Sequence, residues 1–550
     1  MNLSKLRSVI SFPETKITGG QAKLSMIAIV TLVIAASTWQ GLYNLDPHHW
    51  GLMLSNAIDL QDGKTPYRDI FIQYGFLTTL IHAASIKILG TSLWALIAVT
   101  SFFYGVGLFG LYSIGIKLGS SPSQAFAAFV LVAALHPIVI YPWSNYLAFP
   151  FLSWGLFFLL PPHNHKASIF VGGFLLGCAV LCREGLFPPV AVFSLIYCAT
   201  VFLTPSSETS RSQKVQHITL LLIGTGCVLM LFFIYLTIEK ILPYWYKLSI
   251  ELPIIYADLF LKDGIFYSSL KFLGYLIKKS IYLNPRFMFF TLILIISVYF
   301  IFSFIKVKGK YSNSIFLTSI LSCLLFSSSL HLHEIFRLAT GPSLGAALVF
   351  LALKSQRTKK TLFWLFFITM ILTASLRQSG NYFFPSQKTL SEATFITAPP
   401  VFYGQRWPAG VQDFYVQFKN DLENIHGAGC GIEFHHNETE DAFLAILSPF
   451  KQYQIAPFGM GMQTIEPGHR RPKDLRPDLN VEKKIQNADD IVLFARVKKE
   501  DIGNYEPPKN FTELSRYIIP KSKFLPDQNW LVIVVPQKCV KKIGSNKSAH

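Results

Sequence analysis

The residues best suited to chemistry stand in the short stretch "LDPHHWG", residues 45–51, which directly follows a run of about twenty apolar residues. Asp46 is a carboxylate at the predicted membrane boundary, next to His48 and His49. A carboxylate held between water and lipid can take a proton from a nucleophile. The competing interpretation is structural: Asp46 caps a new helix that has Pro47 in its first turn.

The histidines beside Asp46 raise the question of a metal ion. Adjacent histidines on a helix point about 100° apart and rarely share one ion, so packing or hydrogen bonding is favoured for His48 and His49. The later stretch "HLHE", residues 331–334, resembles a metal motif only loosely, and no HExxH pattern is present. We therefore predict no cofactor, and a divalent metal is not favoured.

The first loop continues as a predicted amphipathic helix that lies in the membrane interface. The apolar residues that recur there at helical spacing are Trp50, Met53, Leu54, Ala57 and Ile58. The sequence "DGKTPYRD" then predicts a turn that brings three charged residues back toward the membrane, namely Lys64, Arg68 and Asp69.

Further polar residues stand at the ends of later apolar segments. Asn145 begins one segment, Arg183 and Glu184 follow another, and Arg337 stands at a third. Guanidinium groups pair well with phosphate oxygens, so the two arginines are candidates for a phosphate site. The alternative for each arginine is that it extends from a helix end to water.

These residues must be positioned by membrane helices. The chain has 550 residues, of which 51% are hydrophobic and 15% are charged, whereas a soluble domain carries about a quarter charged residues. Its apolar runs are long enough to span a hydrocarbon core of about 30 Å. We therefore predict a mainly helical, polytopic membrane protein. The apolar segments are 24–43, 70–89, 92–116, 122–141, 143–160, 167–183, 186–204, 216–238, 287–306, 313–330, 338–354 and 361–376.

The positive charges predict the topology. Short loops rich in Lys and Arg usually lie on the cytoplasmic side of the membrane. We therefore place these loops and the basic N-terminal segment 1–23 in the cytoplasm. Between the first external loop, 44–90, and the basic loop at Lys117 the chain must cross an odd number of times, yet two apolar segments lie there. The segment 70–89 is short and carries polar residues, so we expect it to lie along the outer interface. About eleven spans result.

The last part of the chain, residues 378–550, is predicted to form a small α/β domain outside the membrane. It contains runs typical of strands, separated by turn-rich stretches. These runs are "GIEF" (431–434), "DDIVLFARV" (489–497) and "WLVIVVP" (530–536). Cys430 and Cys539 could pair in an oxidising compartment, and the sequence leaves this open.

Most of the net charge of +18 lies in residues 1–377, the predicted membrane part. Residues 1–377 hold 28 basic and 12 acidic residues, whereas residues 378–550 hold 21 and 19. Cationic cytoplasmic loops are typical of membrane proteins, so the charge does not imply a nucleic-acid partner.

The order of these features resembles the GT-C superfamily of integral-membrane glycosyltransferases. The shared features are an acid that leaves the first span, a loop helix, a "G-x-x-P-Y-x-D" turn at 63–69 and "Q-Y-G-x-L" at 73–77. The protein O-mannosyltransferase branch has a similar D-E-x-H-F-G run, with Pro47 here in place of the glutamate. A multispan core with an external C-terminal domain is also similar to the aminoarabinose transferases.

The resemblance implies a transferase whose catalytic domain is residues 24–377. A sugar linked to polyprenyl phosphate would be the donor, and a surface glycan such as lipopolysaccharide, a lipid or a protein would be the acceptor. Asp46 would be the base, in a bacterial inner membrane with the N-terminus cytoplasmic and the C-terminal domain extracytoplasmic. The family often has a second acid where this chain has Asn145. The expected substrate-binding residues are His48, His49, Lys64, Arg68, Asp69, Tyr74, Asn145, Arg183, Glu184, His333, Glu334 and Arg337.

Three other functions remain open. A polysaccharide polymerase or ligase would need its key arginines in a large late loop. A transporter or flippase of lipid-linked sugars would show charged residues within its spans and an internal repeat, and neither is clear in this sequence. The third possible function is that of a non-catalytic assembly protein.

Overall fold

The structure is a computed structural model, and part of the chain is described by it. The described residues are 19–47, 49–72, 74–135, 142–161, 166–203, 210–251, 254, 264–282, 284–306, 312–330, 335–352, 387–430, 433–437, 442–449, 451–452, 491–498, 500–507, 510–519 and 529–547. The predicted segment 361–376 lies outside them, and so do His48, His333 and Glu334.

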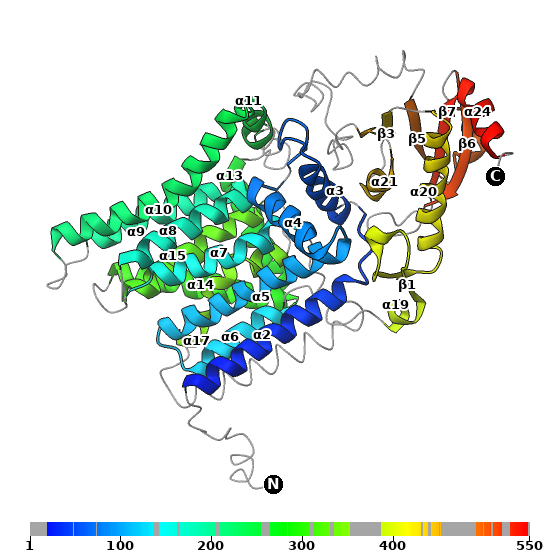
Figure 1. Cartoon of the computed structure of the whole chain (residues 1–550). Helices are drawn as coiled ribbons and strands as arrows, with labels where there is room; N and C mark the ends of the chain where they lie inside the picture. Colours follow the sequence, from blue (N-terminus) through cyan, green and yellow to red (C-terminus); the bar gives the residue numbers. More distant parts are fainter. Residues whose placement is uncertain are drawn as a thin grey trace, which may run out of the picture.

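Helices of the first 352 residues form one bundle (Figure 1). Among the described residues, five helical stretches are long and apolar enough to cross a membrane, as expected of an integral membrane protein. They are Leu24–Gly41, Leu93–Lys117, Glu184–Leu203, Arg211–Ile238 and Pro285–Lys306. The main helices are α2 (Gly19–Gly41), α3 (His49–Gln61), α4 (Phe76–Leu89), α5 (Leu93–Lys117), α6 (Pro122–Leu135), α7 (Ser144–Leu159), α8 (Lys166–Cys182), α9 (Phe187–Leu203), α10 (Arg211–Ile238), α11 (Leu242–Tyr246), α13 (Gly264–Ile281), α14 (Pro285–Lys306) and α15 (Asn313–Leu325).

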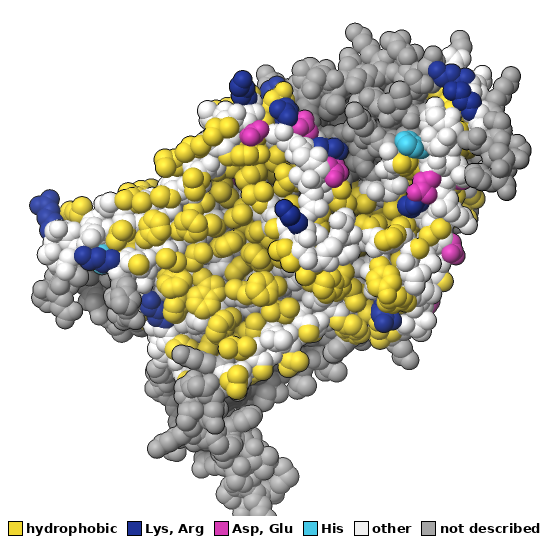
Figure 2. Space-filling view, viewed as in Figure 1, with side chains coloured by type: hydrophobic (Ala, Val, Ile, Leu, Met, Phe, Trp, Pro, Cys, Tyr) yellow, Lys and Arg dark blue, Asp and Glu magenta, His cyan; other side chains and the backbone are white. Residues whose placement is uncertain are grey.

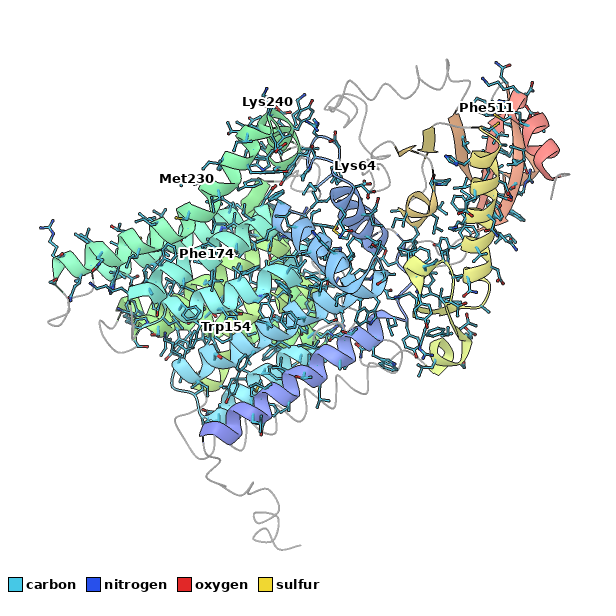
Figure 3. All side chains as sticks on the ribbon, viewed as in Figure 1. Lys64, Trp154, Phe174, Met230, Lys240 and Phe511 are labelled. Atoms are coloured by element: carbon cyan, nitrogen blue, oxygen red, sulfur yellow. The ribbon has the colours of Figure 1, made fainter. Side chains whose placement is uncertain are left out.

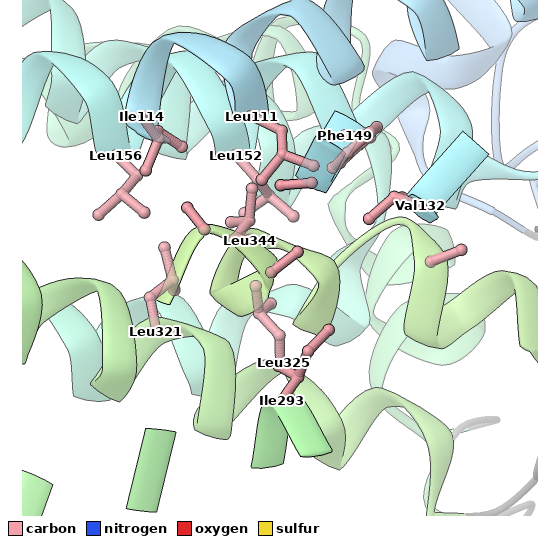
Figure 4. Close-up of a cluster of buried hydrophobic side chains, with 14 of the residues drawn as sticks. Leu111, Ile114, Val132, Phe149, Leu152, Leu156, Ile293, Leu321, Leu325 and Leu344 are labelled. Atoms are coloured by element: carbon pink, nitrogen blue, oxygen red, sulfur yellow. The ribbon is translucent and has the colours of Figure 1, made fainter. Parts of the chain in front are cut away.

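The bundle is apolar both inside and outside. In its interior, Leu111 of α5, Leu152 of α7 and Leu325 of α15 are buried in one hydrophobic cluster with Leu344 (Figure 4). Its outer surface is largely hydrophobic, with Lys and Arg side chains toward the ends of the helices (Figure 2). A helix surface without charge is what a lipid environment requires, so Figure 2 agrees with a membrane location.

One predicted helix is broken. The segment 338–354 was expected to be a single helix, but the structure has α16 (Ile335–Ala339), a turn, the 3-10 helix η4 (Pro342–Gly345) and then α17 (Ala346–Ala352). Pro342 has no backbone N–H and its ring clashes with the preceding turn of a helix, so the chain restarts there. The restarted helix is buried inside the bundle.

Helix α13 was not predicted from the sequence. It is amphipathic: Phe272 and Leu276 are buried, whereas Lys271 and Lys278 are exposed. It packs against α14. Its pattern is hard to recognise because it follows an aromatic and charged loop rather than a long apolar run.

The C-terminal part is a small α/β region, as predicted (Figure 1). Its five-stranded sheet has the order β4-β3-β5-β7-β6, with β3 parallel to β4 and β5, and β7 antiparallel to β5 and β6. The predicted strands correspond to β3, β5 and β7, and β6 was missed. Its elements are α19 (Gln387–Glu392), β1 (Ala393–Phe395), η5 (Pro400–Phe402), β2 (Arg406–Pro408), α20 (Val411–Gly427), β3 (Glu433–Asn437), α21 (Ala442–Leu447), β4 (Lys451–Gln452), β5 (Ile491–Lys498), η8 (Ile502–Asn504), β6 (Phe511–Ile518), β7 (Asn529–Pro536) and α24 (Gln537–Lys547).

Helix α3 joins the two parts, and this corrects its predicted position in the lipid interface. Its apolar residues Trp50, Leu54 and Ala57 are fully buried in protein. They share a hydrophobic cluster with Phe402 and Phe443 of the C-terminal region, and α3 packs against α4, α5 and α21. The amphipathic pattern was identified correctly, but a protein surface rather than lipid covers the apolar face.

Candidate functional site

Asp46 lies at the exit of α2 and is fully buried. Its Oδ1 accepts a hydrogen bond from the backbone N–H of His49 at 2.9 Å. Its Oδ2 lies 3.0 Å from Nδ1 of the His49 ring. The carboxylate therefore caps the start of α3, as predicted, and it also pairs with a histidine. Because a carboxylate offers about four lone pairs, these two contacts leave room for a further hydrogen-bond donor.

An aromatic ring packs against His49, and polar groups of residues adjacent in the sequence are buried. The His49 ring packs edge-on against Trp143, with ring centroids 5.1 Å apart. The indole Nε1 of Trp50 and the hydroxyl of Ser144 are buried and have no hydrogen-bond partner among the described residues. Buried polar groups usually have a partner, so these two can donate to a polar ligand or to water.

The loop that carries Asp46 is held by the C-terminal region. The backbone N–H of Ala442, at the start of α21, donates to the carbonyl of Pro47 at 3.1 Å. The backbone N–H of Arg406 donates to the carbonyl of Leu42 at 2.8 Å. The two bonds lie on either side of Asp46, so both the bundle and the C-terminal region position this carboxylate.

The first loop also docks on the end of α8. Gly75 has φ +108, and a Cβ there would lie 2.5 Å from the carbonyl oxygen of Cys182, so this close approach requires glycine. The hydroxyl of Thr78 donates to the same carbonyl at 2.8 Å. The "Q-Y-G-x-L" motif thus fixes the loop against the residue that precedes Arg183.

The structure brings together two of the predicted site residues, Arg183 and Asn145. Nη1 of Arg183 donates to the side-chain oxygen of Asn145, which is buried at the start of α7. Asn145 thus presents an amide oxygen that holds the guanidinium of Arg183 at the start of α7.

Glu184, which the sequence predicts to bind substrate, is half-buried and bonds to two side chains of the fold. Its Oε1 accepts hydrogen bonds from the hydroxyl of Tyr67 at 2.9 Å and from the indole of Trp245 at 3.3 Å. Tyr67 is fully buried, and burial, followed by the charge of Glu184, raises its pKa well above the usual value. The hydroxyl therefore stays protonated and donates. The three residues tie the first loop, the end of α8 and α11 together.

We expect Tyr67→Phe to lower the free energy of unfolding by about 1–3 kcal/mol, because the carboxylate of Glu184 loses a donor. Thermal unfolding of the purified chain in detergent measures this change. Tyr403→Phe is the matched control, since Tyr403 is 58% exposed. Equal unfolding temperatures for the two variants would contradict a structural role for the bond.

The charged turn of the first loop pairs internally. Nζ of Lys64 lies 2.6 Å from a carboxylate oxygen of Asp59, and Arg68 bonds to Asp69 at 3.1 Å. Burial acts to raise the pKa of Asp69, but the hydrogen bonds from Arg68 and Thr65 together with the charge of Arg68 outweigh it, so the pKa is lowered. Lys64 lies at the end of the bundle that also carries Lys240 and α11 (Figure 3). Tyr74 is half-buried and packs against both hydrophobic clusters.

Two arginines are almost fully buried at helix starts or ends, each with 8% of its surface exposed. Arg337 was predicted as a site residue, and its Nη1 donates to the carbonyl of Ser328 at 3.3 Å. Arg286, in the first turn of α14, was missed, although "NPRF" places it directly before an apolar run. Helices α14 and α16 pack against each other. Guanidinium groups match the geometry of phosphate oxygens, which makes both arginines candidates for a phosphate contact.

A metal centre is not seen in the part of the chain that the structure describes. No three His, Cys, Asp or Glu side chains there come close enough to hold an ion. His48, His333 and Glu334 lie outside that part.

Comparison with known proteins gives a fold. No family model matches the sequence and no curated protein matches it. Among solved structures, ArnT from Cupriavidus metallidurans matches in the apo state with a TM-score of 0.51 and 11% identity, over 93% of this chain and 98% of that one. The same enzyme bound to undecaprenyl phosphate matches with a TM-score of 0.51 over 94% and 98%. An oligosaccharyltransferase from Archaeoglobus fulgidus, in complex with Zn and sulfate, has a TM-score of 0.46 and 13% identity, over 79% and 63%. The chain thus has the fold of ArnT, a GT-C membrane glycosyltransferase, across nearly its whole length.

Proposed function

We propose that the chain is a membrane glycosyltransferase that moves a sugar from a polyprenyl-phosphate donor to an acceptor on the outer face of the membrane. The observation that carries this proposal is a buried carboxylate, Asp46, at the exit of the first membrane helix of an ArnT-like fold. An ArnT structure that contains undecaprenyl phosphate supports the donor class.

In this proposal Asp46 is the general base. The acceptor hydroxyl gives its proton to a free lone pair of the carboxylate, and the acceptor oxygen attacks the anomeric carbon of the donor. The bond from that carbon to the phosphate oxygen breaks, and polyprenyl phosphate leaves with the bonding electrons. His49, which bonds to Oδ2, orients the carboxylate.

The leaving phosphate carries negative charge, which arginines stabilise. Arg183, Arg286 and Arg337 are the candidates for this contact, the first held by Asn145 and the other two nearly buried. Lys64 and Arg68, which the sequence also predicts to bind substrate, lie in the turn of the first loop, where they pair with Asp59 and Asp69.

The experiment compares the mass of cell-surface glycans in a deletion strain and its parent. We expect a loss equal to one sugar residue, restored by the wild-type chain. Unchanged glycans, lipids and surface proteins in the deletion strain would overturn the proposal. A mass loss would also identify the sugar and the acceptor.

The donor phosphate can be tested without knowing the sugar. We expect Arg286→Gln or Arg337→Gln to weaken binding of undecaprenyl phosphate by about 10- to 100-fold, since a hydrogen bond to a charged group contributes about 1.5–3 kcal/mol. Ligand-induced thermal stabilisation of the purified chain measures the affinity.

Arg211→Gln is the matched control for the two arginine variants, because Arg211 is exposed at the start of α10, the predicted cytoplasmic end. If all three variants bind undecaprenyl phosphate like the wild type, the phosphate lies elsewhere.

A further inference from the structure

Two cysteines of the C-terminal region meet in its core. Cys430 follows α20 and Cys539 lies in the first turn of α24, and their surfaces are only 1% and 2% exposed. Helices α20 and α24 pack against each other, and Cys430 and Cys539 belong to one buried hydrophobic cluster as free, adjacent thiols. Residues 109 positions apart in the sequence are therefore neighbours in this core.

The burial of the two cysteines limits when their thiols can be oxidised. Burial and the neighbouring thiol raise the pKa of Cys539 to about 12. The thiolate is the reactive form of cysteine, so two buried thiols in the folded region react slowly. Any bond between them must form while the region folds, before α24 closes over Cys430.

We propose that Cys430 and Cys539 form a disulfide in the mature protein. The two thiols lose two protons and two electrons as the S–S bond forms. The oxidant is the disulfide of a thiol oxidoreductase outside the cytoplasm, which is reduced to a dithiol. The inference uses the proposed extracytoplasmic position of this region and is independent of sugar transfer.

The position of this disulfide in the fold would make it stabilising. The loop that it closes contains every strand of the five-stranded sheet, from β3 (Glu433–Asn437) to β7 (Asn529–Pro536). A bridge that closes a long loop lowers the entropy of the unfolded chain and so favours the folded state. One covalent bond would thus join α24, which follows the last strand of the sheet, to the end of α20, which precedes the first strand.

The test counts thiols in the full chain. Free thiols are trapped during purification from membranes, and the denatured protein is labelled with maleimide with and without prior reduction. The chain has seven cysteines, so we expect five labels without reductant and seven with it. A peptide pair that links Cys430 to Cys539 should appear in the mass spectrum only before reduction.

The variants make the result specific. Cys430→Ser and Cys539→Ser should each carry six labels under both conditions, whereas Cys227→Ser, in α10, should carry four without reductant and six with it. Seven labels in the unreduced wild type would overturn the disulfide. A membrane-impermeant label at the C-terminus then separates the causes: an external C-terminus with reduced thiols contradicts the bond alone, and a cytoplasmic one contradicts the topology too. Reduced thiols leave the proposed sugar transfer untouched, whereas a cytoplasmic C-terminus would also place the Asp46 loop, which bonds to this region, on the cytoplasmic side.

Discussion

Asp46→Asn should lower sugar transfer by about 100- to 10,000-fold, the usual contribution of a general base. The amide retains an oxygen that can accept the backbone N–H of His49, so the start of α3 is expected to stay capped. It cannot accept the proton of the acceptor hydroxyl. The measurement is transfer to the natural acceptor in membranes, with expression and unfolding temperature measured in parallel.

Asp62→Asn is the control for this variant, because Asp62 belongs to the same loop but is exposed. It should transfer sugar at the wild-type rate. An Asp46→Asn protein that still modifies its acceptor would remove Asp46 from catalysis and leave it only the role of a helix cap. Binding of undecaprenyl phosphate should be unchanged in both variants, which separates loss of the base from loss of the donor site.

Gly51→Leu should reduce transfer by at least about 10-fold without touching the reacting groups. A Cβ at position 51 would lie 2.9 Å from Cβ of Ala442 and 3.1 Å from the backbone nitrogen of Phe443. The longer side chain must push α21 away from α3, which breaks the bond from Ala442 to Pro47 beside Asp46. Displacement of a catalytic group by about 1 Å can cost 100-fold in rate.

The control is Gly226→Leu, because Gly226 is also a helical glycine, but a Cβ there would meet no atom of the described residues within 4 Å. Limited proteolysis should release the C-terminal region faster from Gly51→Leu than from the control. Wild-type transfer together with a wild-type cleavage pattern would show that α21 does not position the Asp46 loop.

The membrane helices could be predicted because lipid demands long apolar runs, and the strands β5 and β7 because their hydrophobic runs are bounded by turn residues. The break before α17 is visible in the sequence as Gly341–Pro342, but the apolar residues that follow obscure it. For helix α3, the sequence could predict the helix but not its surroundings. Its pattern reveals an apolar face, but no local signal says whether lipid or protein covers that face.

Part of the candidate site could be predicted from the sequence, and part could not. Asp46 stood out because an acid, a proline and two histidines rarely follow a membrane helix, and its contact with His49 is local. The bond between Tyr67 and Glu184 joins residues 117 positions apart. The turn motif "G-x-x-P-Y-x-D" contains Tyr67 but gives no sign of its partner, so only the fold could reveal that it donates to Glu184.

The contact between Gly51 and Ala442 has a consequence for the order in which the molecule is made. About 390 residues separate the two positions, and synthesis at about 5–20 residues per second takes about 20–80 s to cover that distance. Throughout this time α3 has left the ribosome, while α21, which packs against it, does not yet exist. The first external loop is therefore among the earliest parts of the chain to be synthesised and among the last to be completed.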